Sequence, residues 1–114
     1  MSYIRNQIQL IGNLGQDPEL KTFESGVQAA NSTIATNEYY KNNKGEKVQD
    51  TQWHNLIAWG KTAELMTSLL SKGDEVALQG RLVHKKYEDK SGQTKYIAQI
   101  VVRDFVKLGR KSDS

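Results

Sequence analysis

The sequence contains no cysteine, one proline and two histidines among its 114 residues. Without cysteine there are no disulfides, no thiolate catalysis and no cysteine-ligated metals. His54 and His84 lie thirty residues apart and have no acidic partner at short spacing, so neither resembles a metal ligand or a catalytic base. We therefore expect no metal, no cofactor and no enzymatic activity.

Long hydrophobic runs are also missing. No apolar segment approaches the roughly 20 residues needed to cross a membrane. The N-terminus, MSYIRNQIQL, lacks the charged start and apolar centre of a signal peptide. The segment GNLG at 12–15 is not followed by the Lys-Ser/Thr pair of a phosphate-binding loop. These absences lead us to expect a cytoplasmic protein without a membrane partner.

The charge balance is mildly basic, with 16 Lys and Arg against 13 Asp and Glu and a net charge of +3. This balance permits a nucleic-acid partner but does not require one. Hydrophobic residues make up 37% of the chain, which is little for one self-sufficient domain of this length. Either the core is thin, or partner chains or a ligand cover part of the surface.

Hydrophobic periodicity predicts five strands and one helix. Alternating apolar and polar residues favour strands, and the spacing of Ala63, Met66 and Leu69 favours a helix that ends before Gly73. The predicted strands cover residues 4–14, 27–40, 48–59, 75–88 and 94–102, the last with an extension through 108, and the helix covers 62–71. This order indicates an all-β OB-fold, a five-stranded Greek-key barrel with one helix between strands 3 and 4. Other small barrels and α+β sandwiches share similar orders.

The third predicted strand contains Trp53 and Trp59, which have the same parity and therefore emerge from one face. Both faces of this strand are partly apolar, so the pattern does not say which is buried. On the fourth strand, Val76, Leu78, Gly80 and Leu82 form the predicted core face. The opposite parity carries three polar or aromatic side chains on the predicted exposed face: Arg81, Lys85 and Tyr87.

Rings beside lysines are what a groove for single-stranded nucleic acid requires, because bases stack on the rings and cations follow the phosphates. The hairpin arms supply both, with lysines in 41–47 and 85–95. The plain alternative is that aromatics favour strands anyway and that lysines favour loop tips. The pattern by itself supports the two interpretations equally.

Several segments resemble the bacterial single-stranded DNA-binding protein (SSB) family. They are NQIQLIGNLGQDPEL at 6–20, NSTIATNEYY at 31–40, WHNLIAWGKTAELM at 53–66, KGDEVALQGRLVHKKY at 72–87 and SGQTKY at 91–96. The resemblance runs from about residue 4 to 109 and implies an OB-fold domain at residues 1–109. It also implies a homotetramer in the cytoplasm, at the nucleoid, that binds and protects single-stranded DNA without sequence preference during replication, recombination and repair.

The resemblance also implies site residues. The stacking aromatics of the family fall on Tyr40, Trp53, Trp59 and Tyr87, where the family more often has Trp at the first and last positions and Phe at the third. The other implied DNA contacts are Asn55, Lys61, Arg81, Lys85 and Lys86. His54 matches a position near a subunit contact, and Ile97, Ile100 and Val101 are expected to be covered by other subunits.

Two features depart from the family. Asn55 stands where many members carry Arg, so one charged contact is missing. The chain ends in a short polar tail, residues 110–114, instead of a Gly/Gln/Pro-rich linker and an acidic tip ending in Pro-Phe. The recruitment of replication and repair proteins through such a tail is therefore not carried over.

Two other functions stay open at this stage. The chain would serve as an OB-fold adaptor subunit if protein partners were its main task, and the missing tail and Asn55 agree with that. An RNA-binding OB module is the other alternative, because a stacking platform does not demand deoxyribose.

Overall fold

The computed structural model describes residues 3–109, so the predicted tail at 110–114 lies outside the described residues. The elements along the chain are η1 (Tyr3–Asn6), β1 (Ile8–Leu14), β2 (Glu19–Thr22), β3 (Gln28–Lys41), β4 (Lys47–Trp59), α1 (Gly60–Leu69), β5 (Glu75–Glu88) and β6 (Thr94–Gly109). The strands form one sheet in the order β1-β5-β6-β4-β3-β2.

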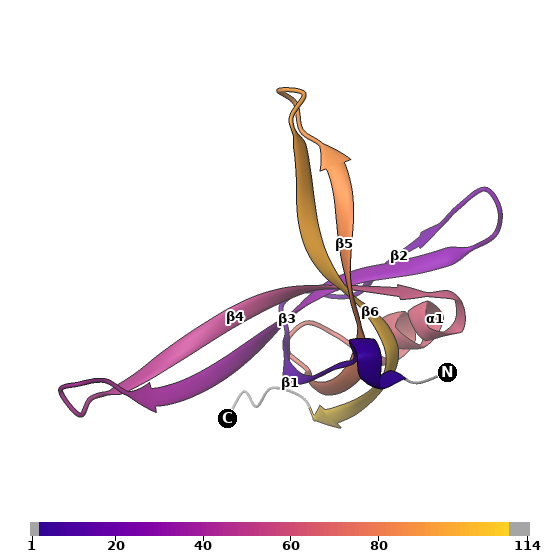
Figure 1. Ribbon diagram of the computed structural model, residues 1–114. Coiled ribbons are helices and arrows are strands. Elements are labelled where there is room, and N and C mark those ends of the chain that lie inside the picture. Colours follow the sequence, from indigo (N-terminus) through magenta and orange to yellow (C-terminus); the bar gives the residue numbers. More distant parts are fainter. Residues whose placement is uncertain (1–2, 110–114) are drawn as a thin grey trace.

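An additional pairing between β1 and β3 closes this sheet into a barrel of five strands, β1, β3, β4, β5 and β6 (Figure 1). All neighbours are antiparallel except β4 and β6, which run parallel from the pair Asn55–Gln99 to the pair Ile57–Val101. Helix α1 lies between β4 and β5 in the chain, which are the third and fourth strands of the prediction. The predicted OB-fold, a five-stranded barrel with one helix, is confirmed.

The core fills the barrel with side chains of one parity from each strand, and on β5 these include Val76 and Leu78 of the predicted core face. Its buried members are Leu14, Ala30, Ile34, Leu56, Ala58, Ala63, Met66, Leu70, Val76, Leu78, Ile100 and Val102. Helix α1 contributes Ala63 and Met66 to this core. Among residues 3–109, no helix is long and apolar enough to cross a membrane.

Two predictions about single apolar residues are wrong. Ile100 was expected to be covered by other subunits, but it is buried inside the barrel of its own chain. Leu82 was assigned to the core face, but it is 37% exposed because β5 leaves the barrel there and continues into a projecting hairpin.

Element boundaries also differ from the prediction. Residues 4–6 belong to a short 3-10 helix and not to the first strand. Strand β2, which pairs with β3 from Glu19–Asn31 to Thr22–Gln28, was not predicted at all. Helix α1 begins at Gly60, directly after Trp59. Strand β6 is continuous through its predicted extension, with a register shift opposite Gln79 and Gly80.

Backbone hydrogen bonds join the segments around 12–18 and 71–74, which belong to two different sequence motifs. The backbone N–H of Leu14 donates to the carbonyl of Asp74 (3.0 Å), and the N–H of Gly73 donates to the carbonyl of Leu14 (2.9 Å). Asp74 is buried, and its carboxylate accepts from the N–H of Ser71 at 2.8 Å and lies 3.5 Å from Lys107 Nζ. The segments around 12–18 and 71–74 are therefore one structural unit.

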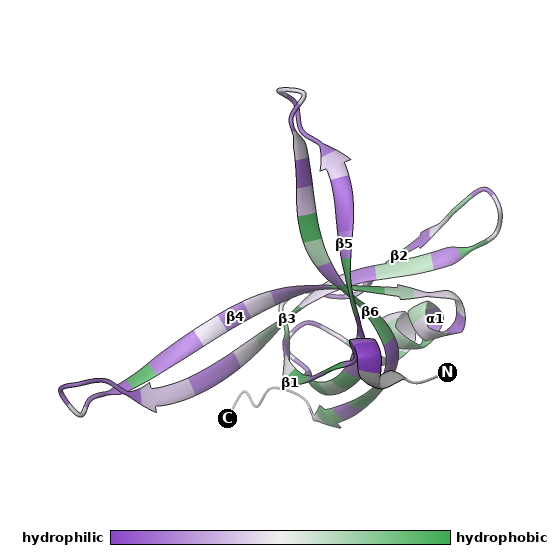
Figure 2. Ribbon diagram, viewed as in Figure 1, coloured by the Kyte–Doolittle hydropathy of each residue, from purple (hydrophilic) through white to green (hydrophobic). Residues whose placement is uncertain are grey.

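Three hairpins extend beyond the barrel, formed by β2–β3, β3–β4 and β5–β6 (Figure 1). They raise the radius of gyration to 16.2 Å, against about 13 Å for a compact chain of this length. The ends of the β3–β4 and β5–β6 hairpins are mostly polar, whereas the apolar residues concentrate toward the barrel (Figure 2). These ends bury little apolar surface of their own chain.

All three hairpins end in the same type of five-residue turn, at 23–27, 42–46 and 89–93. The N–H of the first residue donates to the carbonyl of the fifth, and the N–H of the fourth donates back to the carbonyl of the first. The fourth residue is a glycine with positive φ in each turn, at Gly26, Gly45 and Gly92. Such a backbone conformation strains other residues, which explains why glycine recurs at this place.

Candidate nucleic-acid interface

Strand β4 has one buried and one exposed face, and the tryptophans lie on the exposed one. Leu56 and Ala58 are 1% and 0% exposed and point into the barrel, whereas Trp53 and Trp59 are 62% and 45% exposed. The interior of the barrel has room for the leucine and the alanine, and the larger rings lie outside. The odd-numbered face of β4 is therefore the outward face, which the sequence pattern alone did not determine.

The ring of Trp53 is held against the backbone of a neighbouring turn. A Cβ atom placed on Gly15 would lie 2.4 Å from a carbon of the Trp53 ring and 2.5 Å from Oγ1 of Thr33. Because no side chain fits there, glycine at position 15 allows the indole to pack against the backbone of this turn. The ring is exposed to solvent and yet supported from behind.

The outward face of β4 continues across the neighbouring strands. Ile57 pairs with Asn31 of β3 on one side and with Val101 of β6 on the other, and Val101 pairs with Arg81 of β5. Directly paired residues point to the same side of a sheet. Arg81 therefore shares a surface with the tryptophans, although β5 is not adjacent to β4.

Along β5, Lys85 and Tyr87 have the same parity as Arg81 and extend this surface onto the β5–β6 hairpin. Tyr87 is 44% exposed. Asn55, on the same face of β4 as the tryptophans, is half-buried. These three predicted site residues thus belong to one continuous surface with Arg81.

Three predicted site residues lie elsewhere. Lys86 pairs with Tyr96 on the opposite face of the β5–β6 hairpin from Lys85. Tyr40 pairs with Val48 and has the opposite parity to the residues that pair with the tryptophans. Lys61 lies in the first turn of α1, where its exposed ammonium is 3.9 Å from Glu64.

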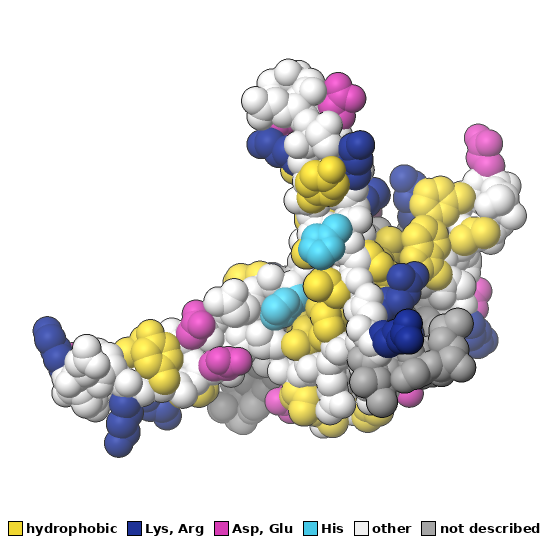
Figure 3. Space-filling model, in the orientation of Figure 1, with side chains coloured by type: hydrophobic (Ala, Val, Ile, Leu, Met, Phe, Trp, Pro, Cys, Tyr) yellow, Lys and Arg dark blue, Asp and Glu magenta, His cyan; other side chains and the backbone are white. Residues whose placement is uncertain are grey.

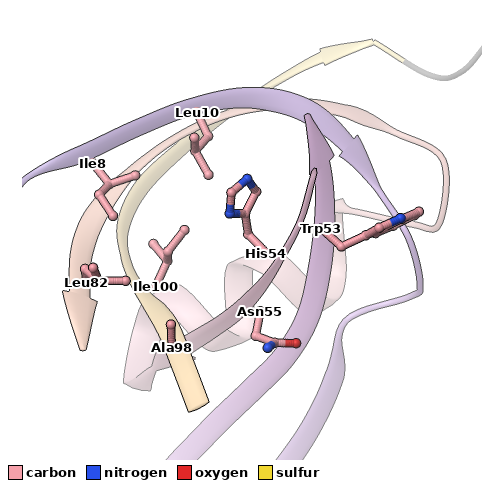
Figure 4. A pocket seen from close by; sticks show the side chains of 8 residues that line it. All are labelled: Ile8, Leu10, Trp53, His54, Asn55, Leu82, Ala98 and Ile100. Atoms are coloured by element: carbon pink, nitrogen blue, oxygen red, sulfur yellow. The ribbon is translucent and has the colours of Figure 1, made fainter. Parts of the chain in front are cut away.

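His54 lies on the inner face of β4, away from the tryptophans. Its Nε2 is 3.1 Å from Oγ1 of Thr36. The ring faces an open pocket of about 440 Å³ (Figure 4). The apolar side chains around it come from β1, β5 and β6: Ile8, Leu10, Leu82, Ala98 and Ile100. Figure 4 shows Trp53 pointing away from this pocket. Trp53 and Asn55 also line this pocket. The predicted subunit contact therefore lies beside an apolar hollow that adjoins the tryptophan surface.

Basic side chains lie near the ends of the β3–β4 and β5–β6 hairpins, whereas an acidic side chain stands at the end of the β2–β3 hairpin (Figure 3). One acidic group, Asp89, stabilises the tip of the β5–β6 hairpin. Its carboxylate accepts from the hydroxyl and N–H of Ser91 and from the N–H of Gln93, and it lies 3.3 Å from Lys95. The Ser91 hydroxyl, followed by the Gln93 N–H, lowers the pKa of Asp89. Among residues 3–109, no three His, Asp or Glu side chains are close enough to hold a metal ion.

Two rings of this surface are not among the predicted site residues. Tyr39 pairs with Gln49 and so lies on the Trp53 side of the β3–β4 hairpin, with Lys47 Nζ 4.7 Å from its ring centre. Phe23, in the β2–β3 turn, lies next to Trp59 with ring centres 6.1 Å apart. Parity identifies Tyr39 only once the register is known, and Phe23 lies in a turn that has no periodic signal.

Comparison with known proteins gives the family. The model of the single-strand binding protein family matches residues 5–108. Single-stranded DNA-binding protein 1 of Chlorobaculum tepidum is 41% identical over 107 residues, which is 93% of this chain and 66% of that relative. The chain thus spans about two thirds of the relative's length.

Two solved structures resemble the fold. Plasmodium falciparum SSB, solved in complex with single-stranded DNA, gives a TM-score of 0.84 at 31% identity, over 90% of this chain and 94% of that chain. A deletion mutant of the single-stranded DNA binding protein from Thermus aquaticus gives a TM-score of 0.79 at 24% identity, over 90% of this chain and 50% of that chain. With the family match covering nearly all of the described residues, this chain belongs to the single-strand binding protein family.

Proposed function

We propose that this protein binds single-stranded DNA without sequence preference and protects it during replication, recombination and repair. The observation that carries the proposal is the exposed face of β4, where Trp53 and Trp59 stand on a surface that extends to Arg81. Rings stack on any base, and cations neutralise the phosphates. The complex of a similar fold with single-stranded DNA supports the same ligand.

The proposed contacts are Tyr40, Trp53, Asn55, Trp59, Lys61, Arg81, Lys85, Lys86 and Tyr87. The aromatic rings and the amide of Asn55 meet the bases, and the lysines and Arg81 meet the phosphates. Tyr40 and Lys86 belong to hairpins that are two strands wide, so a DNA strand that bends around a hairpin reaches both of its faces. The protein acts by binding, without catalysis.

We further propose that the protein is a homotetramer working in the cytoplasm at the nucleoid. The apolar pocket beside His54 supports an association between subunits, because it leaves Leu82 and Ile8 partly open to water. Light scattering measures the mass of the assembly, and a monomeric mass at micromolar concentration would contradict this part of the proposal.

Titration of the tryptophan fluorescence with oligo-dT tests the DNA assignment. Stacking contributes about 1–3 kcal/mol per base, so Trp53→Ala and Trp59→Ala should each weaken binding by that amount without unfolding the barrel. Leu69→Ala is a matched control, because it removes apolar surface from a side chain that is 53% exposed at the end of α1 and is not one of the proposed contacts. Indifference of the fluorescence to oligo-dT, or an equal loss in the control, would refute the assignment. Competition with oligo-U separates DNA from RNA preference.

A further inference from the structure

We propose that the binding track on β3 and β4 continues at both ends into two ring–lysine pairs, Tyr39–Lys47 and Phe23–Lys21, which take further nucleotides. This inference rests on the proposed function, since it extends the same surface. It adds two stacking rings and Lys21 to the predicted site residues, and it gives Lys47, one of the lysines at 41–47, a place beside Tyr39.

The first pair lies on the β3–β4 hairpin. Tyr39 is 58% exposed, and Lys47 Nζ lies 4.7 Å from its ring centre, within reach of a cation–π interaction. Tyr39 pairs with Gln49, and both have the parity of Trp53 and its partner Ala35. The ring therefore lies on the tryptophan side of the ladder, toward the tip of the hairpin.

The ladder between Tyr39 and Trp53 is polar on this side. Oδ1 of Asn37 accepts from Thr51 Oγ1 at 2.6 Å and from Gln49 Nε2 at 2.9 Å. These bonds tie the two strands together across the hairpin between the two rings. A nucleotide that passes from one ring to the other meets a fixed polar surface with hydrogen-bonding groups.

The second pair lies at the other end of β3. Lys21 pairs with Ala29, and Ala29 pairs with Trp59, so the lysine and the tryptophan share one face. Phe23 stacks beside Trp59 at 6.1 Å with an interplanar angle of 24°, and it is 39% exposed. Lys21 Nζ lies 5.2 Å from the Phe23 ring centre. This end thus repeats the arrangement of the first, a half-exposed ring with an ammonium group over it.

Strand β3 connects the two pairs. It forms one hairpin with β4 and the other with β2, and Figure 1 shows the two hairpins leaving the barrel in opposite directions. Tyr39 pairs with Gln49 of β4, and Trp59 follows Gln49 by ten residues on the same strand. This separation corresponds to about 33 Å along the strand. A row of rings of this length, with a lysine at each end, suits an extended strand of several nucleotides better than a single base.

Binding of two oligonucleotides tests the extension. We choose oligo-dT of about 4 and about 16 nucleotides, the limits covered by one OB-fold. Tyr39→Leu and Phe23→Leu remove the rings and keep apolar volume, and each should raise the Kd for the longer oligonucleotide about fivefold or more. The shorter one fits on Trp53 and Trp59 alone and should bind almost unchanged. Tyr39→Phe and Phe23→Tyr keep the rings and should bind like the parent chain.

A single-tryptophan reporter gives a readout that does not depend on affinity. Trp53→Phe and Trp59→Phe remove the native signal, and Tyr39→Trp or Phe23→Trp then places one indole at either end of the track. Stacking of a base should quench each reporter when the longer oligonucleotide binds. Leu69→Trp in the same background is the control on α1 and should stay unquenched.

The outcomes separate the two proposals. Circular dichroism first establishes that each variant is folded. If Trp53→Ala weakens binding but the leucine variants bind normally and both reporters stay bright, the extension is wrong and the proposed function stands. If the parent chain does not bind oligo-dT, both fail together.

Discussion

The backbone of Gly15 lies against the indole ring of Trp53, so closely that a single added methyl group would come within 2.4 Å of the ring. The turn that contains Gly15 is itself anchored to the barrel, because the Gly15 N–H donates to the carbonyl of Thr33 at 2.9 Å. The ring therefore has a fixed support behind it, while its outer side is open. Such a support fixes the orientation of the ring in the free protein.

Gly15→Ala should weaken oligo-dT binding by about 1 kcal/mol although it leaves every ring in place, because the displaced indole loses part of its stacking. The fluorescence spectrum of the free protein should change as well. Gly109→Ala is the matched control, since a Cβ at Gly109 meets no atom within 4 Å. Unchanged affinity and spectrum in Gly15→Ala would show that the support is irrelevant.

The salt dependence of binding should distinguish cations from rings. For single strands, the logarithm of the affinity falls with the logarithm of salt concentration by about 0.7 per neutralised phosphate. Lys85→Gln should therefore make the slope shallower by about 0.7, whereas Tyr87→Leu should weaken binding at every salt concentration and keep the slope. Titrations at four or more salt concentrations give both numbers. Identical slopes in the two variants would contradict the assignment of Lys85 to a phosphate.

The tip of the β5–β6 hairpin should loosen in acid. The pKa of Asp89 in the folded protein is lowered below its ordinary value of 3.8, so the ionised carboxylate stabilises the tip above that value. This stabilisation is lost as the pH falls through the folded-state pKa. NMR signals of the Ser91 and Gln93 amides should report the change, because both donate to this carboxylate.

The β3–β4 hairpin supplies the control for this titration. Its turn has Asn42 at the equivalent place, whose amide oxygen accepts from the N–H of Lys44 at 2.9 Å and of Glu46 at 3.0 Å. An amide does not titrate, so the Lys44 signal should stay constant through the acid range. Asp89→Asn should keep the turn and remove the pH dependence, and a persistent transition in that variant would assign it to another group.

The buried carboxylate of Asp74 should contribute measurably to stability. Asp74→Ala removes the acceptor of the Ser71 N–H and the partner of Lys107, and hydrogen bonds to charged groups contribute about 1.5–3 kcal/mol. We expect a loss of about 2–3 kcal/mol in the free energy of unfolding by urea, measured at one protein concentration. Asp74→Asn keeps an acceptor and should lose less. Equal stability of Asp74→Ala and the parent chain would rule out this role.

The barrel was predictable because its strands have one face in water and one in the core. Leu14 and Leu78 lie at the parity that the barrel buries, and Met66 marks the inner side of α1. On β4 both faces are partly apolar, so alternation alone did not place Leu56 inside. Where burial differs between the two faces, alternation reveals the strand and its orientation. The order of the elements indicated the OB-fold, and the family resemblance implied the same fold.

The hairpins were harder to predict, because both of their faces are in water. Tyr39 and Tyr40 are 58% and 55% exposed, so nothing in their surroundings sets one apart from the other. Only the ladder, in which Tyr39 pairs with Gln49, assigns a face to each. The same reason explains why the short β2 was missed: all four of its residues are exposed.

Two of the three turns at the hairpin tips, together with the lack of cysteine, make the chain suitable for labelling. Asn43 and Lys90 are exposed in the turns of different hairpins. Cysteines at these two places would be the only thiols of the polypeptide, and dyes attached there would lie on the hairpin tips, outside the barrel. A donor on one tip and an acceptor on the other would report by energy transfer whether the two hairpins move toward each other when a polynucleotide is wound around them.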